Sequence, residues 1–296
     1  MGEVLRIGTR RSALALAQAN EVVASLRVHG FEATLVEIVT SGDRGEVSAD
    51  RRGLKGLFVA EIVRALQEGR VDLAVHSAKD LPSEDPEGVV VAAVPPRQDP
   101  RDALVMRESE LHPGDTVGTS SLRRRSQMKR LRPELALAPL RGNVDTRLRK
   151  VADGNLDAAV LAAAGLARLG LRPEHMAPLS TDEMMPAPGQ GALAVHTRAG
   201  EEHPVSLLDD ALSHLAYLAE RRVMDLLGGG CALPFAAFAN VGEDRYVELR
   251  AAVFELDGSN LVRAEAVSDD PEEAAELVYE GLLERGAADV LRKALE

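Results

Sequence analysis

The chain of 296 residues has one cysteine, no tryptophan and only 3% aromatic residues. A single cysteine cannot form an internal disulfide or a thiolate cluster, so we expect a reducing compartment and no metal site. So few rings argue against base stacking on nucleic acid. No apolar run approaches the roughly 20 residues of a membrane helix, and the N-terminus lacks the pattern of a signal peptide. We therefore expect a cytoplasmic protein that binds neither nucleic acid nor membrane.

Lysine is also scarce, whereas arginine is abundant. The chain has 35 basic and 47 acidic residues, a formal net charge of −12, yet only five of the basic residues are lysine. The acidic total speaks against a general nucleic-acid binder. Arginine suits bidentate recognition of carboxylate or phosphate groups. A GC-rich genome would produce the same bias, so the ratio alone does not establish an anion-binding protein.

Short apolar runs alternate with helical patterns through the first two thirds of the chain. This alternation predicts parallel sheets covered by helices. Two proline- and glycine-rich breaks, Pro95–Pro100 and Pro186–Gly191, predict two crossings between α/β units. Ser12, Ser121 and Asn143 are expected to begin helices. The predicted strands cover residues 4–8, 33–39, 71–76, 89–94, 103–106, 116–118, 135–138, 156–161 and 192–196, and a further helix covers 57–68.

The last third has a different pattern. Two apolar runs, 247–254 and 261–267, flank Asp257–Asn260, which is a strong hairpin signal, and a helix follows over 271–285. The predicted fold is therefore α/β: two doubly wound lobes forming a cleft, as in periplasmic binding proteins, plus a small C-terminal α+β domain. The expected domains are 1–96 with about 192–213 for lobe 1, 97–191 for lobe 2, and 214–296 for the C-terminal domain.

Arginines recur where predicted strands end and helices begin. Thr9–Ser12 has this arrangement in the first lobe, Gly118–Arg125 repeats it in the second, and Arg141–Arg147 is a third example. A helix N-terminus beside arginine is a ready anion site. Each segment could instead be an ordinary capped helix with solvated arginines. Their recurrence indicates a ligand with several carboxylates or phosphates.

Two further segments carry candidate chemistry. Asp80 follows a predicted strand, at the end where α/β folds place ligands, although it could equally be a helix cap or a surface partner of Lys79. Cys231 follows three glycines, so a bulky group could approach its sulfur, although it could equally be a free cysteine in a turn. The polar stretch Ser41–Gly53 is long for a simple connection and favours a mobile lid.

These segments, in this order, resemble the hydroxymethylbilane synthase family, also called the porphobilinogen deaminase family. The resemblance runs from Ile7 to beyond Cys231. It rests on Thr9-Arg10-Arg11-Ser12, Lys55-Gly56-Leu57-Phe58, His76-Ser77-Ala78-Lys79-Asp80-Leu81-Pro82, Gly118-Thr119-Ser120-Ser121-Leu122-Arg123-Arg124, Arg141-Gly142-Asn143, Pro188-Gly189-Gln190-Gly191 and Gly229-Gly230-Cys231.

The resemblance implies a transferase of haem biosynthesis. Such an enzyme joins four porphobilinogen molecules head to tail, releases ammonia at each addition, and then releases the linear tetrapyrrole hydroxymethylbilane by hydrolysis. It implies a dipyrromethane cofactor attached through Cys231, which is then an anchor rather than a turnover nucleophile. Asp80 would be the catalytic carboxylate, stabilising positive charge and accepting pyrrole N–H groups. The family precedent is a monomer.

The resemblance also assigns binding residues. Those implied for the cofactor, besides Cys231, are Lys79, Thr119, Ser121, Arg123, Arg124, Arg147 and Gln190. Those implied for the substrate are Arg10, Arg11, Ser12, Lys55, Phe58, Arg141 and Arg168. The alternative from another class is a non-catalytic bilobal anion-binding protein, which would keep an unmodified thiol. A nucleic-acid module using Arg123–Arg132 is a second alternative, opposed by the acidic total.

Overall fold

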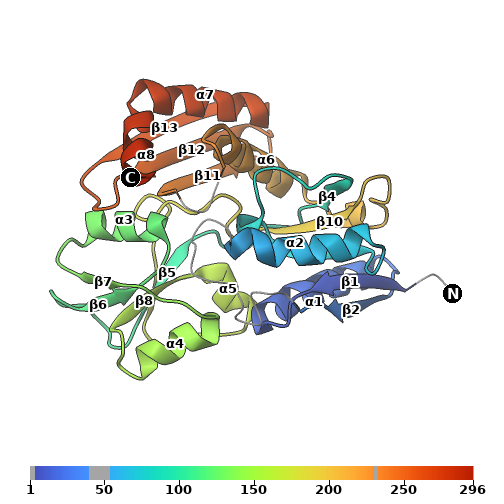
Figure 1. The fold of residues 1–296 in the computed structure, drawn as a ribbon, viewed down its shortest axis with the longest axis horizontal. Helices are drawn as coiled ribbons and strands as arrows, with labels where there is room; N and C mark the ends of the chain where they lie inside the picture. Colours follow the sequence, from blue (N-terminus) through green and yellow to red (C-terminus); the bar gives the residue numbers. More distant parts are fainter. Residues whose placement is uncertain (1–3, 40–53, 230–232, 296) are drawn as a thin grey trace.

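The computed structural model describes residues 4–39, 54–229 and 233–295, with the side chains of 54–58 and 295 outside that description. Three units, each built on its own β-sheet, pack together, with the C-terminal unit lying against the other two (Figure 1). The predicted lid, Ser41–Gly53, and the predicted anchor Cys231 lie outside the described residues.

Lobe 1 is a five-stranded sheet covered on both faces. Its strand order is β2-β1-β3-β10-β4, and β10 runs antiparallel to both of its neighbours. Side chains alternate along a strand, so Leu73 and Val75 of β3 pack with helix α1, whereas Ala74 packs with helix α2. The elements are β1 (Leu5–Thr9), α1 (Ala13–Val28), β2 (Ala33–Glu37), α2 (Leu54–Gln67), β3 (Leu73–Ser77), the 3-10 turn η1 (Ala78–Asp80), β4 (Val89–Ala93), β10 (Leu193–Arg198) and η2 (Val205–Leu208).

Lobe 2 repeats this plan. Its strand order is β7-β6-β8-β5-β9, with β6 parallel to β7 and β8. Leu104 of β5 packs with helix α3 on one face, and its neighbour Val105 packs with helix α4 on the other. The elements are β5 (Asp102–Met106), β6 (Thr116–Gly118), α3 (Leu122–Leu131), β7 (Ala136–Ala138), α4 (Val144–Ala152), β8 (Ala158–Ala162), α5 (Ala163–Arg168) and β9 (Met176–Pro178).

The C-terminal unit is a three-stranded antiparallel sheet with its main core on one face. Helices α6 and α7 cover that face, and α8 packs beside them. The other face contributes Ala236, Ala252 and Phe254 to a small cluster with Met185, which comes from the chain entering the second crossing. The elements are α6 (Ala211–Leu226), β11 (Phe235–Val241), β12 (Val247–Phe254), β13 (Leu261–Ser268), α7 (Pro271–Glu284) and α8 (Ala287–Leu295).

The predicted fold class is confirmed: two α/β lobes are joined by two crossings, and an α+β unit follows. The side chains of Ser12, Ser121 and Asn143 cap α1, α3 and α4, as the sequence predicts. Strands β9 and β11 and helices α5, α6 and α8 were not among the predicted elements. The domain boundaries given above stay a prediction.

The two crossings, residues 95–100 and 186–191, run side by side. The amide of Gln98 in the first crossing donates to the carbonyl of Gly191 in the second, over 3.3 Å. Both lobes therefore meet at this pair of segments, and the functional residues described next lie around it.

Candidate active site

The turn that carries Lys79 and Asp80 follows β3 directly, as the 3-10 turn η1. The amide of Ala78 donates to the carbonyl of Ala192 over 3.1 Å. Gly189 of the second crossing lies so close that a Cβ placed there would be 2.9 Å from backbone atoms of Ala78 and Lys79. Its φ of +69° also favours glycine. The backbone beneath Asp80 is thus fixed between β10 and the second crossing.

The first predicted anion site lies at the same edge of the lobe 1 sheet. Strands β1 and β3 are parallel neighbours, so the ends that lead to Ser12 and to Asp80 lie together. The Ser12 hydroxyl accepts a hydrogen bond from the amide of Ala15 over 3.2 Å. Arg10 is half-buried, whereas Arg11 is exposed and pairs with Glu37 over 3.2 Å.

Gln18, which the sequence analysis did not select, connects these two segments. Its side chain is only 6% exposed, and its amide donates to the Ser77 hydroxyl over 2.6 Å. Ser77 is the last residue of β3, three residues before Asp80. Helix α1 is thereby tied to the strand that presents the catalytic candidate.

The predicted residues of lobe 2 lie at the ends of β6 and β7. Thr119 is buried, and the Ser121 hydroxyl accepts from the amide of Arg124 at the start of α3, over 3.4 Å. Arg141 is exposed in the turn before α4. In the first turns of α4, Arg147 donates to the carbonyl of Gly142 over 2.7 Å.

Charges of the two lobes act on each other across this region. Burial lowers the pKa of the Arg147 guanidinium, and the positive charge of Arg124 lowers it further, while the negative charge of Asp80 opposes both. Lys79 of lobe 1 likewise acts on the carboxyl of Asp102 in lobe 2. The structure therefore brings Lys79 and Asp80 within electrostatic reach of the arginine-bearing edge of lobe 2.

Arg123, Arg124 and Gln190 converge on Asp102, a carboxylate that the sequence analysis did not select. Asp102 Oδ1 accepts from Arg124 Nη2 at 2.7 Å and from Gln190 Nε2 at 2.9 Å, and Asp102 Oδ2 lies 2.8 Å from Arg123 Nη2. The Asp102 side chain is fully buried. Burial alone would raise the pKa of this carboxyl, but the two arginines outweigh it and hold the pKa far below its ordinary value.

Arg123 and Arg124 have a structural role that needs no ligand. Arg123 also donates to the carbonyl of Met185 at 2.6 Å, and Arg124 to that of Val160 at 3.0 Å. Arg123 and Arg124 are each less than a tenth exposed. Both arginines therefore hold helix α3 to β5, β8 and the segment before the second crossing. The cofactor-binding assignment of Arg123, Arg124 and Gln190 stays a prediction.

Arg168 is placed between the lobes. It lies in α5 of lobe 2, and its Nε donates to Glu21 Oε2 of α1 in lobe 1 over 2.9 Å. Its Nη2 donates to the carbonyl of Gly191 over 3.1 Å. Glu21 was not among the selected residues, and the substrate-binding assignment of Arg168 stays a prediction.

Glu220 of α6 connects the C-terminal unit to both crossings. Its side chain is fully buried. Glu220 Oε1 accepts from Arg97 Nη1 and from the amide of Ala239, each over 2.7 Å, and Oε2 accepts from the amide of Gly189 over 2.6 Å. One carboxylate thus holds together the first crossing, the second crossing and strand β11.

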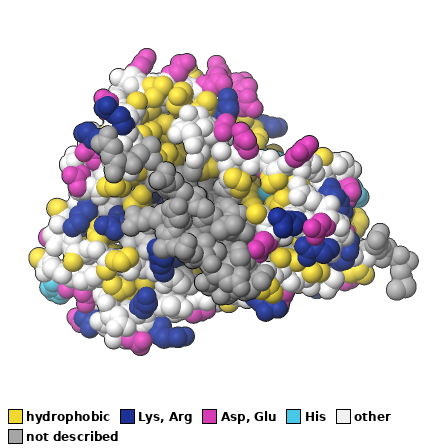
Figure 2. Space-filling view, viewed as in Figure 1, with side chains coloured by type: hydrophobic (Ala, Val, Ile, Leu, Met, Phe, Trp, Pro, Cys, Tyr) yellow, Lys and Arg dark blue, Asp and Glu magenta, His cyan; other side chains and the backbone are white. Residues whose placement is uncertain are grey.

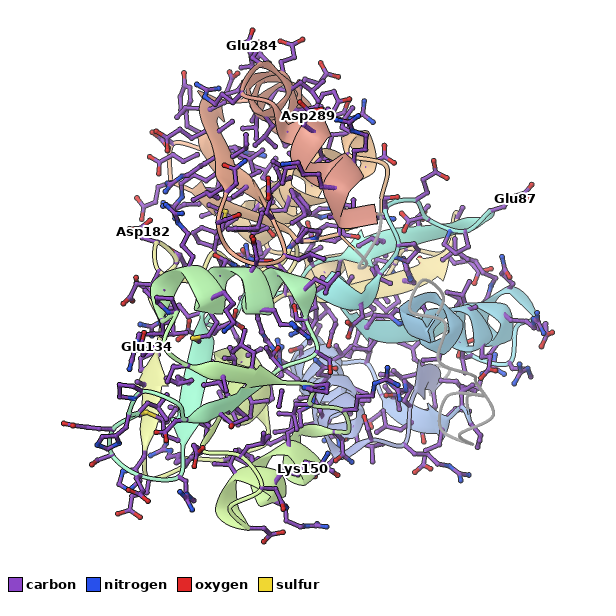
Figure 3. The ribbon with its side chains drawn as sticks, turned by 60° about the vertical axis from the view of Figure 1, so that its left-hand side comes forward. Glu87, Glu134, Lys150, Asp182, Glu284 and Asp289 are labelled. Carbon is purple, nitrogen blue, oxygen red and sulfur yellow. The ribbon has the colours of Figure 1, made fainter. Side chains whose placement is uncertain are left out.

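The C-terminal unit also contacts each lobe directly. Arg250 of β12 pairs with Asp182, which Figure 3 labels beside α3, and donates to the Thr181 hydroxyl over 3.1 Å. Gly229, after α6, lies against Ser83: a Cβ at Gly229 would be 2.6 Å from the Ser83 hydroxyl oxygen. Ser83 comes three residues after Asp80, so the segment leading toward Cys231 passes beside the Asp80 loop.

A line of polar side chains runs from the buried His76 and His196 to the exposed Asp85 of the same loop. The rings of His76 and His196 make an edge contact with centroids 5.2 Å apart. His196 Nε2 lies 3.1 Å from Asp85 Oδ1, to which Arg221 of α6 donates over 2.8 Å. Burial and the neighbouring His196 lower the pKa of His76 to about 3, so His76 is neutral near pH 7. His76 therefore does not neutralise the nearby charge of Asp80.

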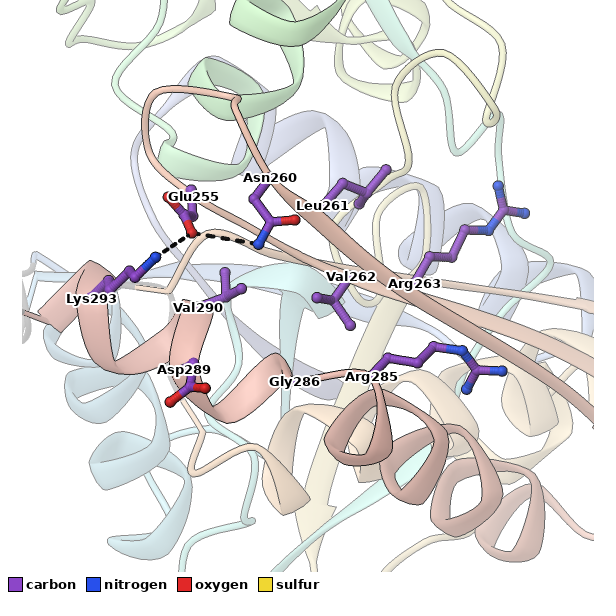
Figure 4. A pocket seen from close by; sticks show the side chains of 10 residues that line it. All are labelled: Glu255, Asn260, Leu261, Val262, Arg263, Arg285, Gly286, Asp289, Val290 and Lys293. Atoms are coloured by element: carbon purple, nitrogen blue, oxygen red, sulfur yellow. Dashed lines mark hydrogen bonds and ion pairs between the residues drawn. The ribbon is translucent and has the colours of Figure 1, made fainter.

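Other surfaces do not contain the predicted site. A cavity of about 630 Å³ lies in the C-terminal unit between β13 and α8 (Figure 4), and shares no residue with the predicted set. Acidic side chains gather over that unit at the top of the face in Figure 2, where α7 carries five glutamates.

Among the described residues, no group of three or more His, Cys, Asp or Glu could hold a metal ion. Within the same ranges, no helix is long and apolar enough to span a membrane.

The described fold and site define a two-lobed α/β protein with a carboxylate at the end of β3 and arginines around it. Two family models match this chain. The porphobilinogen deaminase, dipyromethane cofactor binding domain covers residues 5–205, and the porphobilinogen deaminase, C-terminal domain covers residues 214–284.

Two relatives in sequence agree with that match. Porphobilinogen deaminase of Brevibacillus brevis is 46% identical over 98% of this chain and 97% of its own length, and that of Mycobacterium leprae is 45% identical over 97% and 96%. A periplasmic substrate-binding protein of an ABC transporter from Coxiella burnetii matches 69% of this chain and 88% of its own, at 13% identity and a TM-score of 0.42.

The chain belongs to the porphobilinogen deaminase family. The predictions of a transferase of tetrapyrrole biosynthesis, with hydroxymethylbilane synthase activity and a dipyrromethane cofactor, are confirmed. The alternatives of a non-catalytic anion-binding protein and of a nucleic-acid module are not needed.

Proposed function

We propose that Asp80 is the catalytic residue of this hydroxymethylbilane synthase and that Cys231 attaches the dipyrromethane cofactor. The observation that carries the proposal is the position of Asp80. It lies on a backbone fixed against Gly189 and Ala192, within electrostatic reach of Arg147 from the other lobe.

The residues present fit a cofactor with pyrrole N–H groups and several carboxylates. Asp80 supplies an acceptor for N–H groups, and the arginine-bearing segments supply cations for carboxylates. The helix N-termini capped by Ser12 and Ser121 add oriented backbone N–H groups. When bound, the cofactor supplies a primer whose free end is extended by substrate rings.

Asp80 performs electrostatic catalysis in this proposal. Loss of ammonia from porphobilinogen creates positive charge next to a pyrrole ring, and a fixed carboxylate stabilises that charge most when it need not reorient. His76, neutral near pH 7, does not neutralise the negative charge of Asp80. Arg147 faces the same region and is proposed to bind a carboxylate while Asp80 acts on the ring nitrogen.

The remaining binding assignments are proposed as the family resemblance implies them. Lys79, Thr119, Ser121, Arg123, Arg124, Arg147 and Gln190 bind cofactor carboxylates, and Arg10, Arg11, Ser12, Lys55, Phe58, Arg141 and Arg168 bind substrate. Their placement supports this for the segments at the ends of β1, β6 and β7. The side chains of Lys55 and Phe58 lie outside the described residues.

We also propose that the enzyme works as a monomer in the cytoplasm and does not bind nucleic acid. The net charge of −12 supports the last point. Sedimentation of the purified protein with and without duplex DNA checks both the oligomeric state and the absence of binding. A dimer, or a shift with DNA, would contradict this part.

The central experiment compares Asp80→Asn with Glu87→Gln, an exposed carboxylate in the same β3–β4 connection (Figure 3). Asparagine keeps the size of Asp80 and removes its charge. We expect kcat to fall about 10²–10³-fold in Asp80→Asn, the cost typical of one removed electrostatic group, and to change little in Glu87→Gln. A loss of less than tenfold in Asp80→Asn contradicts the proposed role.

Intact mass under denaturing conditions tests the attachment. The purified protein should carry an added mass equal to two pyrrole units, and Cys231→Ser should lack it even after incubation with porphobilinogen. Added mass that persists in Cys231→Ser would move the attachment to another residue.

A further inference from the structure

The ion pair between Arg168 and Glu21 connects the two lobes beside the second crossing. Arg168 comes from α5 and Glu21 from α1, and the Arg168 Nε to Glu21 Oε2 distance is 2.9 Å. Arg168 also donates to the carbonyl of Gly191 over 3.1 Å. Leu14 of α1 borders Gly165 of α5, so the two helices pack around the pair.

The two partners are covered very differently. The Arg168 side chain is 4% exposed, whereas that of Glu21 is 34% exposed. The carboxylate therefore lies on the open side, and the guanidinium lies behind it. Gln98 of the first crossing adds two long contacts to Glu21, at 3.3 and 3.4 Å. The Arg168 guanidinium is thus nearly covered in this structure, with Glu21 and the carbonyl of Gly191 as its hydrogen-bond acceptors.

The family resemblance assigns Arg168 to the substrate, and the structure gives its guanidinium to Glu21. Both statements hold if one carboxylate replaces the other. The exchange leaves the positive charge of Arg168 paired throughout, so it avoids the large cost of a buried cation without a partner. It also breaks the direct ion pair between α1 and α5.

We propose that Glu21 competes with substrate carboxylates for Arg168 and thereby sets the apparent affinity for porphobilinogen and for the lengthening chain. This inference rests on the proposed function. Substrate carboxylates can bind only those molecules in which Glu21 has released Arg168. The apparent affinity for substrate is therefore the intrinsic affinity multiplied by the fraction of molecules in that state. Glu21 is thus a positioning residue: it acts through Arg168 and holds lobe 1 to lobe 2 until a ligand carboxylate arrives.

The test measures kcat and KM for porphobilinogen in Glu21→Gln. Glutamine keeps the length of the side chain and removes the charge that attracts Arg168. We expect KM to fall about two- to fivefold, the range for loss of one partly exposed charge pair, with a smaller change in kcat. The control is Glu32→Gln, a 68% exposed glutamate of the same lobe that lies 3.9 Å from Arg27. An unchanged or raised KM relative to that control overturns the proposal.

Two further measurements separate competition from a general loosening of the fold. At limiting porphobilinogen, intact masses of Glu21→Gln should show more enzyme carrying added rings than the control, because the chain binds Arg168 more readily. In an Arg168→Gln background, Glu21→Gln should no longer lower KM. The same decrease in both backgrounds would contradict action through Arg168.

The proposed function fails in a distinguishable way. If the unaltered protein carries no pyrrole mass and does not consume porphobilinogen, the proposed function is wrong. If turnover and mass are as proposed and only the KM of Glu21→Gln fails to fall, the competition between Glu21 and substrate is wrong.

Discussion

Asp102→Asn removes a buried charge whose effect on stability can be worked out from the structure. Asp102 is fully buried and is the common partner of Arg123, Arg124 and Gln190. Asparagine keeps the shape and one acceptor oxygen but removes the negative charge. Both guanidinium groups then stay in the interior, with positive charges no longer balanced by a carboxylate.

The expected cost follows from that imbalance. Breaking a buried ion pair by removing one partner costs about 3–5 kcal/mol. At roughly 2–4 °C per kcal/mol for domains of 150–250 residues, the melting temperature should fall by about 6–20 °C. The matched control is Asp99→Asn, the same change three residues earlier. Asp99 pairs with Arg101 over 2.7 Å, but the side chains are 35% exposed for Asp99 and 44% exposed for Arg101. That pair should contribute less than about 1 kcal/mol.

The assay is calorimetric unfolding together with hydrogen exchange of the amides in β5 and α3. Exchange is needed because a chain with several units need not unfold in one step. We expect Asp102→Asn to lower the melting temperature and to speed exchange in β5 and α3 first. If the melting temperature of Asp102→Asn stays within about 2 °C of that of Asp99→Asn, the buried charge is not what stabilises this lobe.

Three other changes test separate contacts. Burial raises the pKa of Asp85, but hydrogen bonds from His196 and Arg221 outweigh burial and lower the pKa to about 2 from an ordinary 3.8. The ionised Asp85 carboxylate therefore stabilises the fold fully above about pH 4, and this stabilisation is lost as pH falls toward 2. The free energy of unfolding should therefore depend less steeply on acid pH in Asp85→Asn than in the unaltered protein. Gly189→Ala places a methyl group 2.9 Å from the backbone of Lys79 and should lower kcat by tenfold or more. Circular dichroism should show unchanged secondary structure. Full activity would show that the turn carrying Asp80 tolerates displacement. Glu220→Gln removes the buried charge beside Arg97 and should lower the free energy of unfolding by about 3–5 kcal/mol. Hydrogen exchange should increase first in α6. Exchange protection equal to that of the unaltered protein would contradict the role of this carboxylate.

Local signals in the sequence predicted much of the fold. Ser12, Ser121 and Asn143 were identified as helix caps because a capping hydroxyl or amide acts within three residues of its own position. The hairpin at Asp257–Asn260 was similarly identifiable from turn residues between two apolar runs. Strand β11 was missed, because its sequence Phe235–Val241 contains three alanines, and alanine has a weak preference for strands.

The arrangement of the site could be predicted only in part. Asp80 was found because it follows a strand, where α/β folds place ligands. Asp102 was missed because its partners, Arg124 and Gln190, are 22 and 88 residues away. Glu21 is 147 residues from Arg168. No periodicity or motif reports a pairing over such distances, so the sequence assigned these arginines to a ligand and could not show their partners within the protein.

The position of Glu220 has a consequence for any movement of one lobe relative to the other. A rotation of the lobes would turn about the two crossings, since these are the segments that join them. Glu220 is bonded to both, at Arg97 and at Gly189, so it lies next to the axis of such a rotation. Points near an axis travel little, while points far from it sweep long arcs. Helix α6 therefore lies where a rotation of the lobes displaces atoms least. Such a motion would change the distance between the lobe tips far more than the position of α6.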